Sequence, residues 1–184
     1  MKGGLLKIIE DILFFKNYLQ GKGPFDNVSD SVGVRDVIRF YRYRNGYFLT
    51  LLRLSEFMET FRFGWFPRFF LNFLFSSDIS PGCRLGASYF PHPFSIVIGG
   101  SVSIKGPVVI FNDINIGKTY PGVNQKMPVI GRNVIISCGS RILGDISVGS
   151  NVVIGANAVL SKSIGDSKTF IRSDKFFDGT YFQR

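Results

Sequence analysis

From Ile98 onward, aliphatic side chains recur every six residues. They lead the repeats at Ile98, Ile104, Ile110, Ile116, Ile130, Ile136, Ile142, Val148, Ile154 and Leu160. A second small or aliphatic residue stands four positions after most of them, and glycine often follows the lead residue. An α-helix repeats about every 3.6 residues and a strand every two, whereas a stack of short strands with a turn after each repeats every six. The pattern predicts a mainly β chain, folded as a parallel β-solenoid.

Composition divides the chain into three parts. Residues 1–75 hold most of the 20 phenylalanines and have helical spacing, while the repeat and most glycines follow them. We therefore predict an α-helical, aromatic-rich region at 1–75, a solenoid domain at 76–165 and a C-terminal tail at 166–184. The helical patterns run over 5–19, 34–44 and 47–61, and the last two are divided at Asn45-Gly46.

The net charge of +9 is spread along the chain. Residues 1–75 hold 11 basic and 7 acidic residues, and the remainder holds 11 and 6. Because no block of like charge marks a nucleic-acid arm, we expect no nucleic-acid partner. A diffuse positive field attracts small polyanions, acidic polymers or an anionic membrane surface instead.

Several features favour a cytoplasmic protein. Cys83 and Cys138 lie far apart, which argues against a metal clip or a redox pair. Lys7, Glu10 and Asp11 interrupt the first apolar run, so it does not resemble a secretory signal. The longest uncharged stretch contains prolines and glycines and does not resemble a membrane span. We expect a soluble chain, or a peripheral one at the inner face of the cell membrane.

The segment 63–75 is densely aromatic and has two interpretations. Its rings could pack on the end of the solenoid or on a neighbouring subunit. They could also dock at a membrane interface, with Arg53, Arg62 and Arg68 near acidic headgroups. We favour packing, because so small an appendage must bury its phenylalanines to be stable.

The six-residue count is interrupted twice. Leu85 and Ile98 are thirteen residues apart, one more than two repeats, and Pro91-His92-Pro93 lies between them. Ile116 and Ile130 are fourteen apart, two more than two repeats, across the segment 118–127. Insertions in a solenoid become projecting loops, and loops on a rigid scaffold commonly carry function. Both segments are therefore candidate site elements.

His92 is the only histidine in the chain and stands between two prolines. Proline has a restricted φ and lacks a backbone N–H, so the position of His92 should be stiff. Imidazole is an effective general base near neutral pH. The alternative is an ordinary polar residue in a loop.

Three sequence strings resemble the serine acetyltransferase type of hexapeptide-repeat acyltransferase. They are Asp78-Ile-Ser-Pro-Gly-Cys-Arg-Leu-Gly86, His92-Pro-Phe-Ser-Ile-Val-Ile-Gly-Gly100 and Ile136-Ser-Cys-Gly-Ser-Arg-Ile-Leu-Gly-Asp-Ile-Ser-Val-Gly149. The resemblance covers roughly residues 76–165 and, more loosely, the helices before them. It implies a left-handed parallel β-helix, a homotrimer with each active site between two subunits, and acetyl-CoA as the acyl donor without a metal.

The same resemblance assigns roles to individual residues. It makes His92 the base that deprotonates the acceptor hydroxyl and Asp78 the carboxylate that orients the imidazole; the alternative for Asp78 is a turn cap before Ser80-Pro81. The positions that match the family's cofactor groove and nucleotide contacts are Cys138, Ala156, Ser161 and Lys162, and Arg172 is a further phosphate candidate.

The chain departs from serine acetyltransferases at positions that concern the acceptor. Met127-Pro128 replaces a second histidine before a proline, and Pro91 replaces an aspartate. The family's Gly-x-Pro-Ala segment after the last coil is also missing. With one histidine and a short aromatic leader, the chain resembles the sugar O-acetyltransferases of bacterial surface polysaccharides. We therefore expect a sugar or glycan acceptor, with Asn112, Lys118 and Lys126 as candidate contacts.

Three alternatives to this hypothesis exist. One is a serine-acetyltransferase-like enzyme that acts on a small hydroxylated metabolite, and another is a non-catalytic solenoid that serves as an assembly subunit. The third, a zinc-dependent carbonic anhydrase on the same scaffold, needs three histidine ligands, and the chain has a single histidine.

Overall fold

The computed structural model describes residues 4–20, 31–120, 126–172 and 175–178. Four helices come first, α1 (Gly4–Leu19), α2 (Val34–Arg42), α3 (Arg44–Glu59) and α4 (Trp65–Phe75). Short strands follow them: β1 (Asp78–Ile79), β2 (Arg84–Leu85), β3 (Ser88–Tyr89), β4 (Ile96–Ile98), β5 (Ser103–Ile104), β6 (Val108–Ile110), β7 (Ile114–Gly117), β8 (Val129–Ile130), β9 (Val134–Ile136), β10 (Arg141–Leu143), β11 (Ser147–Val148), β12 (Val153–Ile154), β13 (Val159–Leu160), β14 (Lys168–Arg172) and β15 (Lys175–Asp178).

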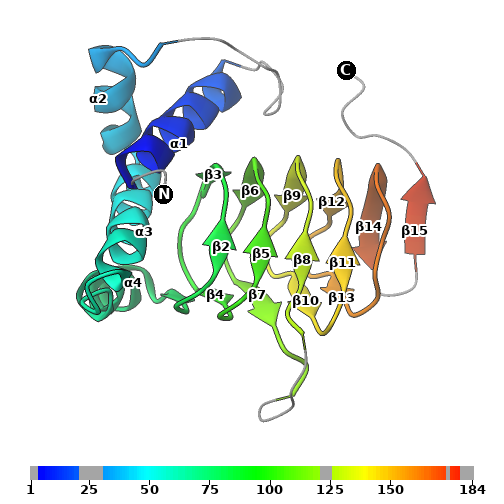
Figure 1. Cartoon of the computed structure of the whole chain (residues 1–184). Helices are drawn as coiled ribbons and strands as arrows, with labels where there is room; N and C mark the ends of the chain where they lie inside the picture. The colour runs from blue at the N-terminus through cyan, green and yellow to red at the C-terminus, as the bar shows by residue number, and fades with distance from the viewer. Residues whose placement is uncertain (1–3, 21–30, 121–125, 173–174, 179–184) are drawn as a thin grey trace.

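The strands form three sheets, and β1 to β13 enter the three sheets in turn (Figure 1). Sheet A has the order β1-β4-β7-β10-β13, sheet B the order β2-β5-β8-β11, and sheet C the order β3-β6-β9-β12-β14-β15. All pairings are parallel except that of β14 with β15. The described strands therefore build a three-sided parallel β-helix, and the predicted solenoid is confirmed.

The lead residues of the repeat form the core of this solenoid. In sheet A, for example, Ile98 pairs in register with Ile116, Ile116 with Ile142, and Ile142 with Leu160. All ten lead residues are buried. The strands alternate, so the residue before a lead residue is at least partly exposed, except at Val109 of β6, which is buried. The six-residue period thus reports the burial of aliphatic side chains in the solenoid.

Sheet C continues beyond residue 165, where the sequence analysis places a tail. Thr169 and Phe170 of β14 pair with Val153 and Ile154, and the Phe170 side chain is buried. Phe170 therefore occupies an inward position although no aliphatic lead residue marks it.

The helices stack against the end of the solenoid formed by its first coil (Figure 1). The division between the second and third helices lies at Tyr43, not at the predicted Asn45-Gly46, which is inside α3. A Cβ atom on Gly46 would lie 2.5 Å from the carbonyl oxygen of Phe40. Gly46 therefore allows the close approach of α2 to α3 and does not act as a helix breaker.

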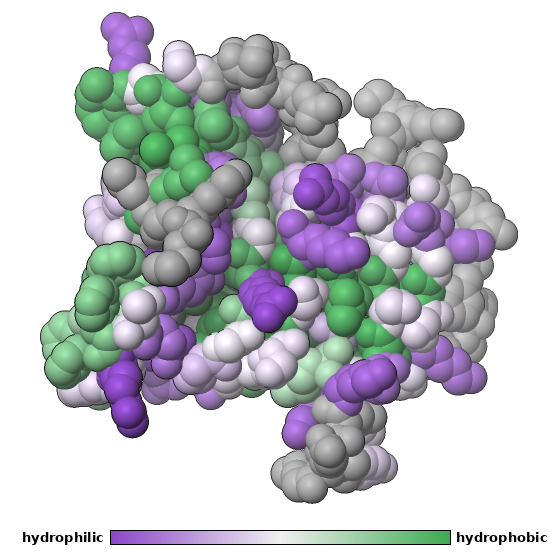
Figure 2. All heavy atoms as spheres, in the orientation of Figure 1, coloured by the Kyte–Doolittle hydropathy of each residue, from purple (hydrophilic) through white to green (hydrophobic). Residues whose placement is uncertain are grey.

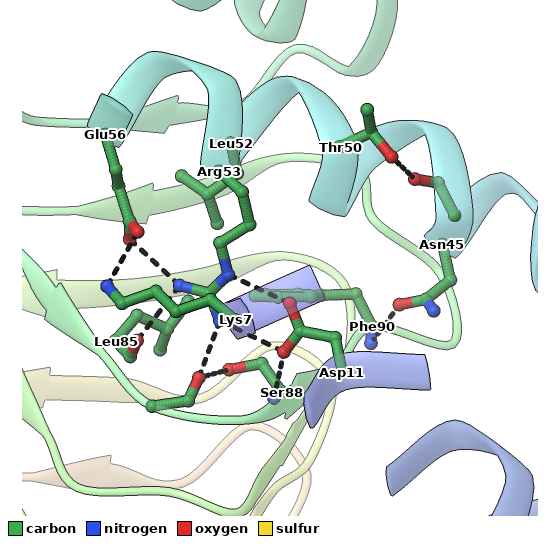
Figure 3. A network of polar contacts seen from close by, with 12 residues as sticks. Lys7, Asp11, Asn45, Thr50, Leu52, Arg53, Glu56, Leu85, Ser88 and Phe90 are labelled. Carbon is green, nitrogen blue, oxygen red and sulfur yellow. Dashed lines mark hydrogen bonds and ion pairs between the residues drawn. The ribbon is translucent and has the colours of Figure 1, made fainter. Parts of the chain in front are cut away.

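A buried ionic network joins the helices to the first coil (Figure 3). Arg53 of α3 donates two hydrogen bonds to Asp11 of α1, at 2.9 and 3.0 Å. It also donates to the carbonyl oxygens of Leu85 and Gly86, at 2.9 and 2.7 Å. The backbone N–H of Ser88 donates to Asp11. One guanidinium thus connects two helices and strand β2.

Burial by itself shifts the pKa values of Asp11 and Arg53 in opposite directions. Desolvation raises the pKa of Asp11, although Arg53 opposes this shift. Burial alone would lower the pKa of Arg53, but the carboxylates of Asp11 and Glu56 outweigh it and raise that pKa. Arg53 therefore stays charged and bound within the protein. The sequence-based placement of Arg53 near lipid headgroups is wrong, because the side chain is 1% exposed and satisfied by internal acceptors.

The aromatic segment forms α4, with one face buried and one exposed. Pro67, Leu71 and Phe75 are buried, whereas Trp65 and Phe73 are 63% and 72% exposed. Packing against the same chain therefore accounts for only part of this segment. No helix in the described residues is long and apolar enough to span a membrane.

Candidate functional site

The predicted site residues lie at the two corners that flank sheet A, which we call its two edges, and on its outer face. The first group lies on the corner between sheets C and A. In sheet C, Tyr89 pairs with Val109, Val109 with Ile135, Ile135 with Val153, and Val153 with Thr169. The third residue after each of these is His92, Asn112, Cys138, Ala156 and Arg172 in turn. We name this series the histidine corner.

Backbone hydrogen bonds support this stacking. The N–H of Gly139 donates to the carbonyl oxygen of Asn112 at 3.1 Å, and that of Asn157 donates to Cys138 at 2.9 Å. Asn112, Cys138 and Ala156 therefore lie one above another on successive coils. For Arg172, the backbone belongs to β14, but the side chain lies outside the described residues.

The corner at His92 is two residues longer than the corners above it. His92 precedes the inward residue Ile98 by six positions, whereas Asn112 precedes Ile116 by four. The turn between β2 and β3 is correspondingly one residue shorter, since Leu85 and Tyr89 pair with Ile104 and Val109. Two residues are added at the His92 corner and one is lost from the preceding turn, so the interval from Leu85 to Ile98 is one residue longer than two repeats. The His92 loop thus projects from the corner, as expected.

Buried neighbours hold this loop in place. Pro93 and Phe90 are buried, and the Phe90 N–H donates to Asn45 of α3 at 2.8 Å. The Phe94 ring contacts Phe75 and lies 5.3 Å from the guanidinium carbon of Arg44. His92 itself is exposed between these anchors. Its main chain is therefore supported on both sides while its imidazole remains accessible.

Asp78 lies at the start of sheet A, near the His92 loop. Its strand β1 pairs with β4, which the loop enters. The preceding residue, Ser77, is buried; its Oγ accepts from the Ile96 N–H at 3.1 Å and lies 3.4 Å from the Pro93 carbonyl oxygen. No hydrogen bond or ion pair joins Asp78 to His92 in the described part of the chain, and both side chains are exposed. Ser77 is a positioning residue that the sequence analysis missed, because a lone serine carries no signal of burial.

The second group lies on the opposite edge of sheet A. Ser161 and Lys162 follow β13, and register places Lys162 level with Gly144 and Lys118 on the coils below. Ser161, Lys162 and Lys118 are exposed. Lys126, which follows Lys118 on the connection between β7 and β8, is also exposed. The predicted cofactor residues are thus divided between two edges, with Cys138 and Ala156 on one and Ser161 and Lys162 on the other.

Between these edges, sheet A presents an outward row that the sequence analysis did not identify. Asp78, Val97, Asn115, Arg141 and Val159 are consecutive register partners in this row. Arg141 also forms a salt bridge with Asp113, at 2.9 Å. Each of the last four residues directly precedes a lead residue of the repeat, and that regularity was available from the sequence.

The two cysteines differ in their surroundings. Cys138 is exposed beside Gly139, whose φ of +73° is unfavourable for residues with a Cβ. Cys138 and Ala156, which lie on successive coils of this corner, both have small, exposed side chains. Burial raises the pKa of Cys83 to about 12, so that thiol is protonated near neutral pH. The described residues hold no group of three or more His, Cys, Asp or Glu suited to a metal.

One hollow lies away from this corner. It has a volume of about 530 Å³ and lies between α3, α4 and the sheet B side of the solenoid, next to Cys83 and Arg84. His92 is not among its lining residues. The histidine corner is therefore an open surface of the single chain, and a second surface would be needed to enclose a ligand there.

Comparison with known proteins identified a family match and related sequences. The profile of the bacterial transferase hexapeptide family (six repeats) matches residues 127–162. Serine acetyltransferase from Staphylococcus epidermidis is 37% identical over 101 residues, which are 54% of this chain and 47% of the relative. The Staphylococcus aureus enzyme is 35% identical over the same length. The chain thus spans about half the length of these relatives.

Solved structures show the same fold. Serine acetyltransferase from Brucella abortus in complex with coenzyme A has a TM-score of 0.78 and 22% identity, with coverage of 96% of this chain and 68% of that one. Isoform 3 from Entamoeba histolytica in complex with cysteine has a TM-score of 0.69 and 21% identity, with coverage of 92% and 58%. The left-handed parallel β-helix with an N-terminal helical segment is confirmed.

Proposed function

We propose that this chain is an acetyl-CoA-dependent O-acetyltransferase of the serine acetyltransferase type. The observation that carries the proposal is the position of His92, which is exposed on a rigidly supported loop at the head of a corner that also bears Asn112, Cys138 and Ala156. The related serine acetyltransferases, among them one solved with coenzyme A, support the choice of acyl donor.

In the proposed mechanism, His92 removes the proton from the acceptor hydroxyl as its oxygen attacks the thioester carbonyl carbon. The carbon–sulfur bond then breaks, and the imidazolium returns the proton to the departing thiolate, which leaves as free coenzyme A. A positioned base contributes about 10²- to 10⁴-fold to such a step. We assign Asp78, whose strand pairs with the strand that the loop enters, as the carboxylate that orients the imidazole and stabilises its cation. No acyl-enzyme is required, since nothing in the described surroundings of Cys138 supplies a base to it.

The donor would occupy sheet A's edges in an assembly. Cys138 and Ala156 would line the pantetheine, while Ser161, Lys162 and Arg172 would meet the nucleotide end. Because the histidine corner is open on one chain, we propose a homotrimer in which a neighbouring subunit closes it. The division of the predicted donor residues between two edges agrees with this arrangement, since two subunits can each contribute one edge.

The acceptor that fits the relatives best is a small hydroxylated metabolite such as serine. We prefer this acceptor to the glycan expected from the sequence, because the relatives described above are serine acetyltransferases. A sugar remains the second candidate on a specific observation. Met127 stands where a second histidine is expected and packs towards Gly99, with its Cε 2.7 Å from a Cβ built there. An apolar side chain cannot form the polar contacts that an amino acid needs at that position. In the sugar case, Asn112, Lys118 and Lys126 would contact the acceptor.

The test is release of free thiol from acetyl-CoA with serine, related amino alcohols and a panel of sugars as acceptors. We expect His92→Ala to lose at least about 100-fold in kcat/KM and Asp78→Asn to lose part of the activity. Lys105→Ala, an exposed residue on a different corner, is the matched control. Light scattering on the same samples measures the mass of the assembly. A His92→Ala protein as active as wild type would refute the mechanism, and a folded wild type inactive with every acceptor would favour an assembly subunit.

A further inference from the structure

The helical region carries an exposed aromatic surface that the proposed reaction does not use. We name it the aromatic face, and its exposed residues are Phe57, Phe61, Phe63, Trp65, Phe66, Phe69 and Phe73. Soluble monomers rarely expose contiguous apolar patches of this kind unless the patch binds something. In Figure 2, hydrophobic atoms gather where Figure 1 places α4.

Ring contacts connect the exposed rings within each of the two helical segments. Along α4, Trp65 contacts Phe66, Phe66 contacts Phe70, and Phe69 stacks on Phe73 with ring centroids 6.0 Å apart. At the end of α3, Phe57 and Phe61 lie 5.6 Å apart. A salt bridge between Glu59 and Arg68 connects the two helices.

The helical region that carries this face is positively charged. Each acidic residue of the described segment 31–75 lies in a salt bridge: Asp36 with Lys16, Glu56 with Lys7 and Arg53, and Glu59 with Arg68. The same region exposes arginines that form no salt bridge in the described residues, namely Arg35, Arg39, Arg42 and Arg44 on α2 and α3, and Arg62 between α3 and α4. The helical surface thus combines exposed aromatic rings with unpaired guanidinium groups.

We propose that the aromatic face docks on the surface of an anionic phospholipid bilayer. Aromatic side chains partition into the headgroup region, and arginines beside them attract acidic lipids. A second copy of the chain fits less well, because joining two such faces would bring unpaired arginines of both copies together. The proposal is independent of the acceptor and of His92.

Trp65 provides a direct probe, since it is the only tryptophan in the chain. Full-length protein is mixed with vesicles of equal parts phosphatidylcholine and phosphatidylglycerol, or of phosphatidylcholine alone. We expect a blue shift of Trp65 emission and quenching by bromine-labelled lipid with the anionic vesicles, and binding at least about tenfold weaker to the neutral ones. Absence of both signals would overturn the proposal.

Two variants and a control extend the test by vesicle flotation. Phe66→Ser/Phe69→Ser/Phe73→Ser removes exposed rings, and Arg39→Glu/Arg42→Glu/Arg62→Glu reverses charge while it keeps the rings. We expect at least about tenfold weaker binding from each, whereas Val129→Ser/Ile171→Ser, at exposed apolar positions on β8 and β14, should bind like wild type. The proposal is wrong if the first two variants float like wild type. It is also wrong if Phe66→Ser/Phe69→Ser/Phe73→Ser lowers the mass measured by light scattering but leaves vesicle binding unchanged. That result would identify a second copy as the occupant.

Discussion

At the scale of single residues, neighbours decide what each side chain can do. His92 is exposed, yet its loop is held by the buried residues Phe90, Pro93 and Ser77. Arg53, by contrast, is removed from solvent by two carboxylates and two carbonyl oxygens. Burial and hydrogen-bond partners thus decide whether a polar side chain is accessible to a ligand or serves only the fold.

The two cysteines should react with thiol reagents at very different rates. Burial raises the pKa of Cys83 from 9.0 to about 12, which reduces its thiolate fraction near pH 8 roughly a thousandfold. We expect Cys138→Ser protein to react slowly with Ellman's reagent at pH 8 until denaturant is added, and Cys83→Ser protein to react at once through the exposed Cys138.

The same shift has a pH dependence with a defined sign. Below pH 9 the Cys83 thiol is protonated in both the folded and unfolded chain, so it does not change stability. Between pH 9 and about 12 only the unfolded chain loses this proton, so the contribution of Cys83 to the free energy of unfolding falls as pH rises. Equally fast labelling of both cysteines in the native protein would contradict this assignment.

At the scale of elements, the stability of each coil depends on the one side chain that each strand buries inside the solenoid. The adjacent residues Val129 and Ile130 of β8 offer a matched comparison, because they are 41% and 0% exposed. Ile130→Ala should lower the free energy of unfolding by about 2–5 kcal/mol through lost burial and a cavity. Val129→Ala should cost under about 1 kcal/mol.

Urea denaturation followed by circular dichroism measures both values. Val129→Ala controls for the lower strand propensity of alanine, since it makes a similar change on the same strand. Equal costs at the two positions would mean that strand propensity, and not burial in the solenoid, accounts for the six-residue pattern.

At the scale of the whole molecule, the buried Arg53 network joins the helical region to the solenoid. Arg53→Met would leave Asp11 buried and uncompensated, and two carbonyl oxygens would lose a donor. We expect the free energy of unfolding to fall by about 3–5 kcal/mol. Asp11→Asn/Arg53→Met should cost less than the sum of the two single substitutions, because the isolated charge is gone.

Thermal unfolding of the three variants and wild type tests this coupling. A near-additive double variant would show that the two side chains do not depend on each other. A loss under about 1 kcal/mol for Arg53→Met would show that the network does not hold the helices on the solenoid.

The sequence alone determined the solenoid, the order of its coils and the single histidine on a projecting loop. These features follow from local rules, since a six-residue period requires a turn after each short strand and two prolines restrict the chain around His92. It also located most residues that the register brings to the two edges of sheet A. In contrast, the burial of Arg53 by Asp11, the packing of Gly46 on Phe40 and the support of the loop by Ser77 depend on contacts between distant segments. Only the tertiary structure decided these, because no local pattern encodes which remote groups meet when the chain excludes water.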